Sequence, residues 1–497
     1  MTDVTDGQRS VGVARRFVAA LLAHHVTDAV LSPGSRSAAL ALALHAADAQ
    51  GLIRLHVRVD EREAAFLALG LAKASGRVVP VITTSGTAVA NLHPALLEAR
   101  HARVRLLAVT ADRPGRLRGT GANQTTDQRQ IFPGIPYSDR VKTFPINALG
   151  GPGHLNLEFD EPLVEPASWD FPRNSSVWSF VDRGVATLVD RRARTVIVAG
   201  DGAGSEAAEL ATRHGFPLLA EPSSGARGEA ALTAYRLVLD DLSGQVERVL
   251  SFGHATLSRP ISRLLSSNTI EVLHQGDQST YPVPAGGNVT FVDGYDVQVD
   301  GDPAWLKQWQ EACAEATRNL PDSESLAIAR AVWAASDGGL LWVGSSNSIR
   351  HLDLVASGGE RRVLANRGLA GIDGTISSAI GASLAQPEAR PAIAVMGDLT
   401  FLHGSNGLLM GPDEPRPDLT IVVANDDGGA IFAGLEQGGP DYAEAFERVF
   451  ATPTGADIAR LCAGYGVPHE SVTAVDLSAA LADPTTGLRV LEVSLTR

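Results

Sequence analysis

Residues 393–429, IAVMGDLTFLHGSNGLLMGPDEPRPDLTIVVANDDGG, are the stretch that decides the fold. Two apolar runs, Ile393 to Met396 and Leu419 to Ala424, each lead into an acidic turn that contains glycine. Apolar runs of this length on either side of a helix-compatible segment predict strand, helix and strand. Because ligands of open α/β sheets bind beyond the carboxyl ends of the strands, we expect both acidic turns to lie at one ligand crevice.

Asp398 and Asp426, one from each turn, are candidate ligands for a hard divalent cation. Their separation, 426 − 398 = 28 residues, suits a crossover between neighbouring parallel strands. Mg²⁺ takes one or two carboxylates and fills its other positions with phosphate, carbonyl and water oxygens, and Gly428 offers a carbonyl at a turn without a side chain. The alternative is that Asp398 only caps a helix and that Asn425 to Gly429 only form a turn.

The composition is that of a globular, acidic protein with several domains. The chain has 497 residues, 44% hydrophobic and 20% charged, and a net charge of −14. This charge argues against a nucleic-acid partner, so an anionic substrate would need locally placed arginines. Only Cys313 and Cys462 are present, which excludes a disulfide framework. With no signal peptide and no apolar run of about 18 residues, we expect a cytoplasmic protein without membrane insertion.

Polar loops follow successive predicted strands between Val11 and Val164. Ser35 and Arg36 precede an expected helix, where free N–H groups and a guanidinium suit an anion. The alternative is that Ser35 or Ser37 only caps that helix. The helix dipole explains an acid such as Glu61 in a first turn, but its place at a strand end predicts a carboxyl in the same crevice. The other candidates on this rim are Thr84, Gly86, Arg113, Asn123 and Gln124.

The middle of the chain contains a weaker signal. Gly200-Asp201-Gly202-Ala203-Gly204 follows a predicted strand, and Glu221 stands at a suitable distance for a ribose hydroxyl, so a dinucleotide site is one interpretation. Glycine-rich turns of this kind are common in doubly wound sheets, which makes the motif unspecific. Arg259 is a candidate substrate-binding residue, whose long side chain would reach out from this region like an arm. The alternative is that Arg259 is only a surface charge.

The third part of the chain returns to the pattern of the first. Predicted strands lead into Gly344 to Arg350, which contains Ser346, and into Asn366-Arg367-Gly368. The acidic stretch then resembles the binding motif of thiamine diphosphate enzymes, which begins with Gly-Asp and closes with Asn-Asn. Leu399 replaces the third residue of that motif, a glycine, and Asp426 replaces its second Asn, but Asp still ligates Mg²⁺.

The chain as a whole is similar to the 2-succinyl-5-enolpyruvyl-6-hydroxy-3-cyclohexene-1-carboxylate (SEPHCHC) synthase family of thiamine diphosphate enzymes. The segments that carry this resemblance occur in a fixed order, and they are Ser32 to Ser37, Asp60 to Arg62, Thr84 to Asn91, Ala111 to Pro114, Gly121 to Gln124, Asn366 to Gly368 and Gly371 to Gly374.

The resemblance implies an α/β protein with the three-domain thiamine diphosphate-enzyme fold, each domain a mostly parallel sheet flanked by helices. We expect a pyrimidine-binding domain at 1–183, a central transhydrogenase-like domain without nucleotide at 184–321 and a diphosphate-binding domain at 322–497. The resemblance also implies thiamine diphosphate with Mg²⁺ (or Mn²⁺), and a homodimer or homotetramer with active sites between subunits.

The implied activity is that of a transferase in menaquinone biosynthesis. 2-Oxoglutarate would be decarboxylated, and the resulting succinyl-semialdehyde carbanion would add to isochorismate to give SEPHCHC and CO₂. The resemblance places Glu61 on the pyrimidine ring. The residues expected to act on substrates are Ser35, Arg36, Glu61, Arg113, Asn123, Gln124, Arg259, Arg350 and Arg367. Those expected at the cofactor are Glu61, Thr84, Gly86, Ser346, Ile372, Gly397, Asp398, Leu399, Asp426, Gly428, Gly429, Ala430, Ile431 and Phe432. The expected metal ligands are Asp398, Asp426 and Gly428.

Two other interpretations fit parts of the sequence. One is a different thiamine diphosphate enzyme, such as a 2-oxoacid decarboxylase or acetolactate synthase. Those enzymes often use histidines or bind FAD, whereas the loops here are rich in Arg and Ser. The other is a non-catalytic nucleotide-binding regulator that uses Gly200 to Gly204, and Glu61 disfavours it because binding alone does not need that carboxyl.

Overall fold

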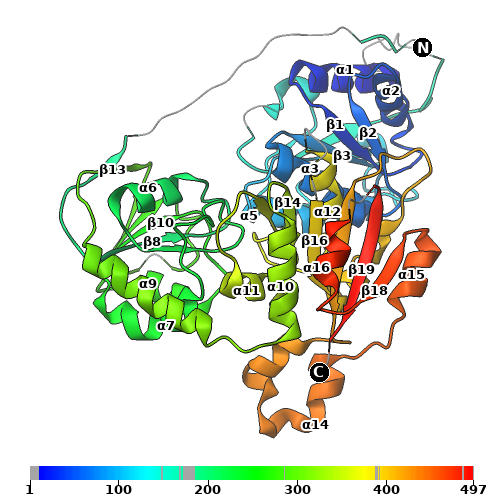
Figure 1. Ribbon diagram of the computed structural model, residues 1–497. Helices are drawn as coiled ribbons and strands as arrows, with labels where there is room; N and C mark the ends of the chain where they lie inside the picture. Colours follow the sequence, from blue (N-terminus) through cyan, green and yellow to red (C-terminus); the bar gives the residue numbers. More distant parts are fainter. Residues whose placement is uncertain are drawn as a thin grey trace.

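The structure is a computed structural model, and it describes residues 10–146, 149–166, 169–171, 185–284, 286–386, 390, 392–483 and 486–495. Three parallel sheets divide this part of the chain into three α/β units in sequence order (Figure 1). The first unit, in blue, lies above the third, in yellow to red, and the central unit, in green, lies to one side. The predicted α/β class with mostly parallel sheets is confirmed.

The first sheet has the strand order β2-β1-β3-β4-β6-β5. Its strands are β1 (Asp28–Leu31), β2 (Arg54–Val57), β3 (Val79–Thr83), β4 (Leu106–Asp112), β5 (Tyr137–Ser138) and β6 (Gly153–Glu158). Its helices are α1 (Ser10–Ala23), α2 (Ala38–Ala49), α3 (Glu61–Ser75), α4 (Thr87–Ala90) and α5 (His93–His101). Side chains of α1 and α2 share one hydrophobic cluster, and those of α3 and α5 share another, so the two pairs cover opposite faces.

The third sheet repeats the order of the first, β15-β14-β16-β17-β19-β18. Its strands are β14 (Leu340–Val343), β15 (Arg362–Leu364), β16 (Ala392–Gly397), β17 (Leu419–Asn425), β18 (His469–Val472) and β19 (Leu488–Ser494). Its helices include α10 (Glu324–Ala335), α11 (Asn347–Val355), α12 (Thr375–Leu384), α13 (Asp398–His403), α15 (Ile458–Tyr465) and α16 (Leu477–Ala482). In both sheets the second strand of the sequence lies at one edge and the fifth at the other, as expected for two copies of one architecture.

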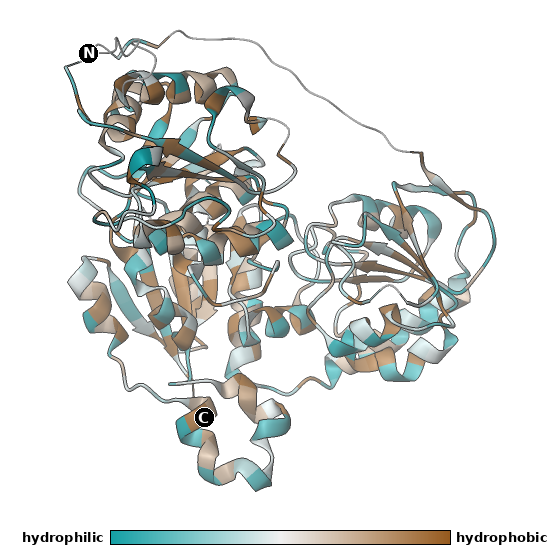
Figure 2. Ribbon diagram, turned by 180° about the vertical axis from the view of Figure 1, so that it is seen from behind, coloured by the Kyte–Doolittle hydropathy of each residue, from teal (hydrophilic) through white to brown (hydrophobic). Residues whose placement is uncertain are grey.

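The central sheet has the order β12-β11-β10-β8-β9. It consists of β8 (Thr195–Ala199), β9 (Leu218–Ala220), β10 (Arg248–Phe252), β11 (Glu271–Gln275) and β12 (Val289–Val292), with β7 (Thr187–Val189) and β13 (Tyr295–Val297) paired separately. Its helices are α6 (Glu206–His214), α7 (Tyr235–Leu242), α8 (Arg259–Leu265) and α9 (Pro303–Arg318), and Figure 2 shows its strands mostly brown between partly teal helices. The expected boundary at 183/184 lies outside the described residues, and the one at 321/322 lies between α9 and α10.

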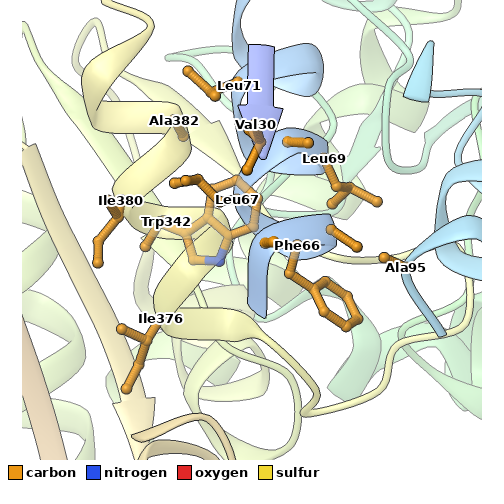
Figure 3. Close-up of a cluster of buried hydrophobic side chains, with 14 of the residues drawn as sticks. Val30, Phe66, Leu67, Leu69, Leu71, Ala95, Trp342, Ile376, Ile380 and Ala382 are labelled. Atoms are coloured by element: carbon orange, nitrogen blue, oxygen red, sulfur yellow. The ribbon is translucent and has the colours of Figure 1, made fainter. Parts of the chain in front are cut away.

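Helices α3 and α12 join the first and third units. Figure 3 shows the two helices side by side, with Leu67 near Ile380 and Trp342. Their backbones come into contact at two glycines, which have no side chain. A β-carbon on Gly70 would lie 2.1 Å from the Ser378 carbonyl oxygen. A β-carbon on Gly381 would lie 2.3 Å from the Leu67 carbonyl oxygen. The contact therefore excludes any side chain at these two positions.

A methyl group at Gly70 is expected to destabilise the protein. Gly70→Ala forces a main-chain shift between α3 and α12, and we expect a loss of about 2 kcal/mol or more in the free energy of unfolding. Gly464→Ala is the control, because Gly464 lies in α15 with open space around it, and alanine favours a helix. Urea unfolding of both variants measures the difference, and equal stability of the two would contradict a tight α3–α12 contact.

Glu63 is a carboxyl buried inside the same contact. Its side chain is 1% exposed, accepts a hydrogen bond from Ser377 Oγ of α12 at 2.5 Å and lies 3.2 Å from an Arg62 guanidinium nitrogen. Burial raises the pKa of Glu63 to about 7, and the hydrogen bond from Ser377 opposes this shift. The native protein therefore holds this proton more tightly than the unfolded chain, in which the pKa is near 4.5.

Removal of this ionisation is expected to change how stability depends on pH. The contribution of the Glu63 proton to the free energy of unfolding is full below pH 4.5 and is lost as the pH rises through about 7. Glutamine stays neutral at every pH. As the pH rises from 6 to 8.5, we therefore expect the free energy of unfolding of Glu63→Gln to increase by about 1–3 kcal/mol relative to that of the wild type. Thermal unfolding at both pH values measures this, with the exposed Glu311→Gln as control. A stability difference that does not change with pH would contradict a buried proton at Glu63.

Candidate functional site

A cavity of about 770 Å³ lies at the carboxyl ends of β16 and β17. The two strands pair in register, with Gly397 opposite Ala424, so the residues that follow them emerge side by side. Asp398, Asp426 and Gly428 all line this cavity. The structure thus brings together the three predicted metal ligands.

Asp398 is buried in a way that suits a cation. Burial raises its pKa to about 6, and the negative charge of Asp426 adds to this effect. Its Oδ2 atom has no hydrogen-bond partner among the described residues. A divalent cation would relieve both the repulsion and the missing contact, so the donor set fits Mg²⁺ or Mn²⁺.

The helix-cap and turn roles, which were the alternative interpretations of Asp398 and Asp426, belong to neighbouring residues. Gly397 occupies the cap position of α13, and no side chain caps that helix end. In the second turn, Asp427 accepts hydrogen bonds from the Thr454 and Gly455 N–H groups, each at 3.0 Å. Asp427 therefore shapes the turn, while Asp398 and Asp426 face the cavity.

The remaining predicted cofactor residues of the third unit surround the same cavity. They are Ser346, Ile372, Gly397, Leu399, Gly429, Ala430, Ile431 and Phe432. Ser346 has φ +74 and ψ −134, a backbone conformation that residues other than glycine rarely adopt and that marks functional sites. Phe432 belongs to a short 3₁₀ turn (Ala430–Gly434) that leads into the excursion containing α14 (Ala443–Phe446), drawn in orange in Figure 1.

A second polar cluster lies at the carboxyl ends of the first sheet. Arg113 donates to Ser85 Oγ at 2.9 Å and to the Gln124 carbonyl oxygen at 2.8 Å, and the Gln124 amide donates to the Ser85 carbonyl oxygen at 2.9 Å. Gly86 has φ +75 and packs so closely that a β-carbon would lie 2.8 Å from Gln124 Cγ. Thr84 packs in the same way against Gly34, next to Ser35.

Glu61 lies on this side of the molecule, at the start of α3. Asp60 caps the helix by accepting from the Arg62 and Glu63 N–H groups, so Glu61 is not needed as a cap. The Glu61 carboxyl is partly buried and lies 3.4 Å from the Asn91 side-chain nitrogen. Of the other predictions here, Ser35, Asn123 and Gln124 are exposed and Arg36 is partly buried.

The two clusters do not share a cavity within one chain. Ser35, Arg36, Glu61, Thr84, Gly86, Arg113, Asn123 and Gln124 are all absent from the described lining of the 770 Å³ cavity. The α3–α12 contact packs the first unit directly against the third.

Four of the five predicted arginines are held by neutral oxygens. Arg36 donates to the Phe159 carbonyl, Arg350 to the Ser346 carbonyl and Arg367 to Thr256 Oγ1, at 3.1, 2.8 and 3.1 Å. Arg113 is held by Ser85 and Gln124, as described above. Within the described residues none of these four forms an ion pair with a carboxylate at 4.0 Å or less.

Arg259 differs from the other four. Its side chain is 74% exposed and forms an ion pair with Glu436 at 2.7 Å. It reaches from α8 to the excursion of the third unit, as an arm would, but its exposure agrees with the alternative of a surface charge.

Gly200, the first glycine of the glycine-rich turn in the central unit, packs directly against a neighbouring loop. A β-carbon on Gly200 would lie 2.1 Å from the Ala255 backbone nitrogen. Glu221 is 1% exposed and accepts a hydrogen bond from the Leu257 N–H at 2.7 Å. The proposed ribose ligand of the dinucleotide interpretation is therefore inaccessible.

Some residues of the two clusters were not singled out from the sequence. Ser85 is the hydrogen-bond centre of the first cluster, and it lies inside the Thr84 to Asn91 motif, which could have pointed to it. Phe446 and Glu447 line the large cavity from the excursion, and no motif in the sequence marks them.

Comparisons with known proteins agree with this geometry. The family described as "Thiamine pyrophosphate enzyme, N-terminal TPP binding domain" matches residues 12–131, and the corresponding C-terminal TPP binding domain matches residues 343–491. A SEPHCHC synthase of Nocardioides sp. is 48% identical over 99% of this chain and 96% of its own length. That of Kineococcus radiotolerans is 44% identical over 98% and 96%. The chain belongs to the SEPHCHC synthase family.

A solved structure supports the fold of this family member. The benzoylformate decarboxylase from Polynucleobacter necessarius superposes with a TM-score of 0.70, covering 98% of this chain and 99% of that one, at 17% sequence identity. Membership of the SEPHCHC synthase family decides against the nucleotide-binding regulator considered above. No helix among the described residues is long and apolar enough to cross a membrane.

Replacement of Asp398 is expected to abolish cation-dependent cofactor binding. Asp398→Asn keeps the shape of the side chain but removes its charge, and we expect thiamine diphosphate affinity in the presence of Mg²⁺ to fall about 100-fold or more. Calorimetric titration with and without EDTA measures this loss, and Asp413→Asn at an exposed position is the control. Unchanged affinity in Asp398→Asn would contradict the metal assignment.

Proposed function

We propose that this protein is a thiamine diphosphate- and Mg²⁺-dependent SEPHCHC synthase, with 2-oxoglutarate and isochorismate as substrates. The observation that supports this proposal most strongly is a single cavity lined by Asp398, Asp426, Gly428, Ser346 and Phe432. The chain that contains it is 48% identical to a SEPHCHC synthase. The three α/β units then serve as pyrimidine-binding, central and diphosphate-binding domains, with the boundaries 1–183, 184–321 and 322–497.

In this proposal the third unit holds the diphosphate end of the cofactor. Asp398, Asp426 and the Gly428 carbonyl would hold the cation, and Ser346 would donate to a phosphate or substrate oxygen. Ile431 and Phe432 line the same cavity and would exclude water from the reacting carbon. Thiamine diphosphate, when bound, supplies the electron sink that decarboxylation of a 2-oxoacid requires.

The arginines would recognise the substrates, which both carry two carboxylates. A guanidinium matches a carboxylate with two parallel hydrogen bonds, and each charged hydrogen bond in a water-poor site contributes about 1.5–3 kcal/mol. Arg36, Arg113, Arg350 and Arg367 are suited to this role because neutral oxygens hold them. Ser35, Asn123 and Gln124 are exposed, Gln124 contacts Arg113, and the three side chains would add neutral hydrogen bonds.

The active site would form between two copies of the chain, in a homodimer or homotetramer. Glu61 belongs to the first cluster, and its carboxyl would hold or release a proton at the pyrimidine ring of the cofactor. The cation site belongs to the third unit, and the two do not meet in one chain. A second copy that brings its first cluster to the large cavity would complete the site.

Mixing of two inactive variants tests both the reaction and the shared site. Formation of SEPHCHC from 2-oxoglutarate and isochorismate is measured by mass spectrometry. Glu61→Gln and Asp398→Asn should each reduce activity about 100-fold or more, because each removes one part of the site. In an unfolded and refolded equimolar mixture, half of the dimers are mixed and have one intact site, so we expect about a quarter of wild-type activity.

The control for this experiment is Glu229→Gln, at an exposed position of the central unit. Absence of product with the wild-type protein would overturn the proposed reaction. A wild-type protein that makes product, together with a mixture that stays inactive, would instead overturn the shared site.

A further inference from the structure

Glu98 of α5 contacts the loop that carries Arg367. It is 4% exposed, and its two carboxylate oxygens accept the Gly368 and Leu369 backbone N–H groups, each at 2.7 Å. The carboxylate belongs to the first unit and the two N–H groups to the third, 270 residues further along the chain. Both oxygens of a buried charge and two loop N–H groups are thus satisfied together.

The loop backbone lies directly against α5. A β-carbon on Gly368 would lie 2.5 Å from the Glu98 carbonyl oxygen and 2.9 Å from the Ala102 nitrogen. Glycine is therefore required for the carboxylate to reach two consecutive N–H groups. The position of Gly368 fixes the residue before it, Arg367.

The same loop is tied to the central unit by different groups. Arg367 is 3% exposed and donates to Thr256 Oγ1. Lys73 donates to the Ala365 carbonyl oxygen and pairs with Asp201 of the central unit at 2.9 Å. Residues 365–369 are thus the place where all three units meet, and only Glu98 holds the main chain on the far side of Arg367 in the described structure.

We propose that Glu98 is a positioning residue, which sets the orientation of the Arg367 guanidinium through the Gly368 and Leu369 N–H groups. This inference rests on the proposed function for the role of Arg367 in substrate binding. The reason that a position must be set is electrostatic: Arg367 has no carboxylate within 4.0 Å among the described residues, and its Nε has no hydrogen-bond partner there. Without the main-chain anchor, the hydrogen bond to Thr256 alone would orient this guanidinium.

The kinetic test compares the KM values for the substrates with the affinity for the cofactor. Glu98→Ala should raise the KM for at least one dicarboxylate substrate about tenfold or more, with kcat changed less than KM and thiamine diphosphate affinity unchanged. Glu98→Gln keeps one strong acceptor oxygen, so its KM should lie between those of Glu98→Ala and the wild type. In the Arg367→Ala background, Glu98→Ala should add little, because the group that it positions is gone. Glu311→Ala on α9, an exposed glutamate, is the control.

A second measurement does not depend on activity. Hydrogen exchange followed by mass spectrometry should show faster exchange in the peptide that covers 366–374 in Glu98→Ala, with other peptides unchanged. Unchanged KM values together with unchanged exchange would overturn the proposal. An equal effect of Glu98→Ala with and without Arg367, or a parallel loss of cofactor binding, would also overturn it, because either result indicates a general structural role. Absence of product with the wild-type protein would instead refute the proposed reaction, and the exchange measurement would still decide whether Glu98 anchors the loop.

Discussion

The backbone contact between α3 and α12 is the constraint on which the arrangement of the site depends. Gly70 and Gly381 bring two helices of different units so close that no side chain fits at either of these two positions. Helix α3 begins at Glu61, and α12 begins directly after the loop that contains Ile372 of the large cavity. One contact therefore fixes the first turn of α3 relative to the cavity, and a site on rigid helices holds its groups more closely than one on free loops.

The likeness of the first and third sheets explains why one chain carries two polar clusters. The first and third sheets have the same strand order, so each has its own edge of polar loops at the carboxyl ends. The first edge supplies Glu61 and Arg113, and the third supplies Asp398 and Asp426. The residues of the first edge are absent from the described lining of the cavity at the third edge.

Most of the site on the third unit could be predicted from the sequence, because local signals define it. The apolar runs fix β16 and β17, and parallel register then places Asp398 beside Asp426. The sequence did not indicate Glu98, since its partners are backbone N–H groups 270 residues away that carry no residue-specific signal. Nor did it show that Gly200 packs against Ala255 or that Glu221 is buried, because both depend on how another loop packs.

The way in which the arginines are held explains how an acidic protein can bind dicarboxylates. A guanidinium paired with a carboxylate has little attraction left for an anion, whereas one held by carbonyl or hydroxyl oxygens keeps its charge. Arg350 and Arg367 are of the second kind, and burial lowers the pKa of Arg350 because its charge is poorly solvated. A substrate carboxylate would restore that solvation. Because the net charge of −14 repels anions at long range, binding of a dicarboxylate depends on local cations of this kind.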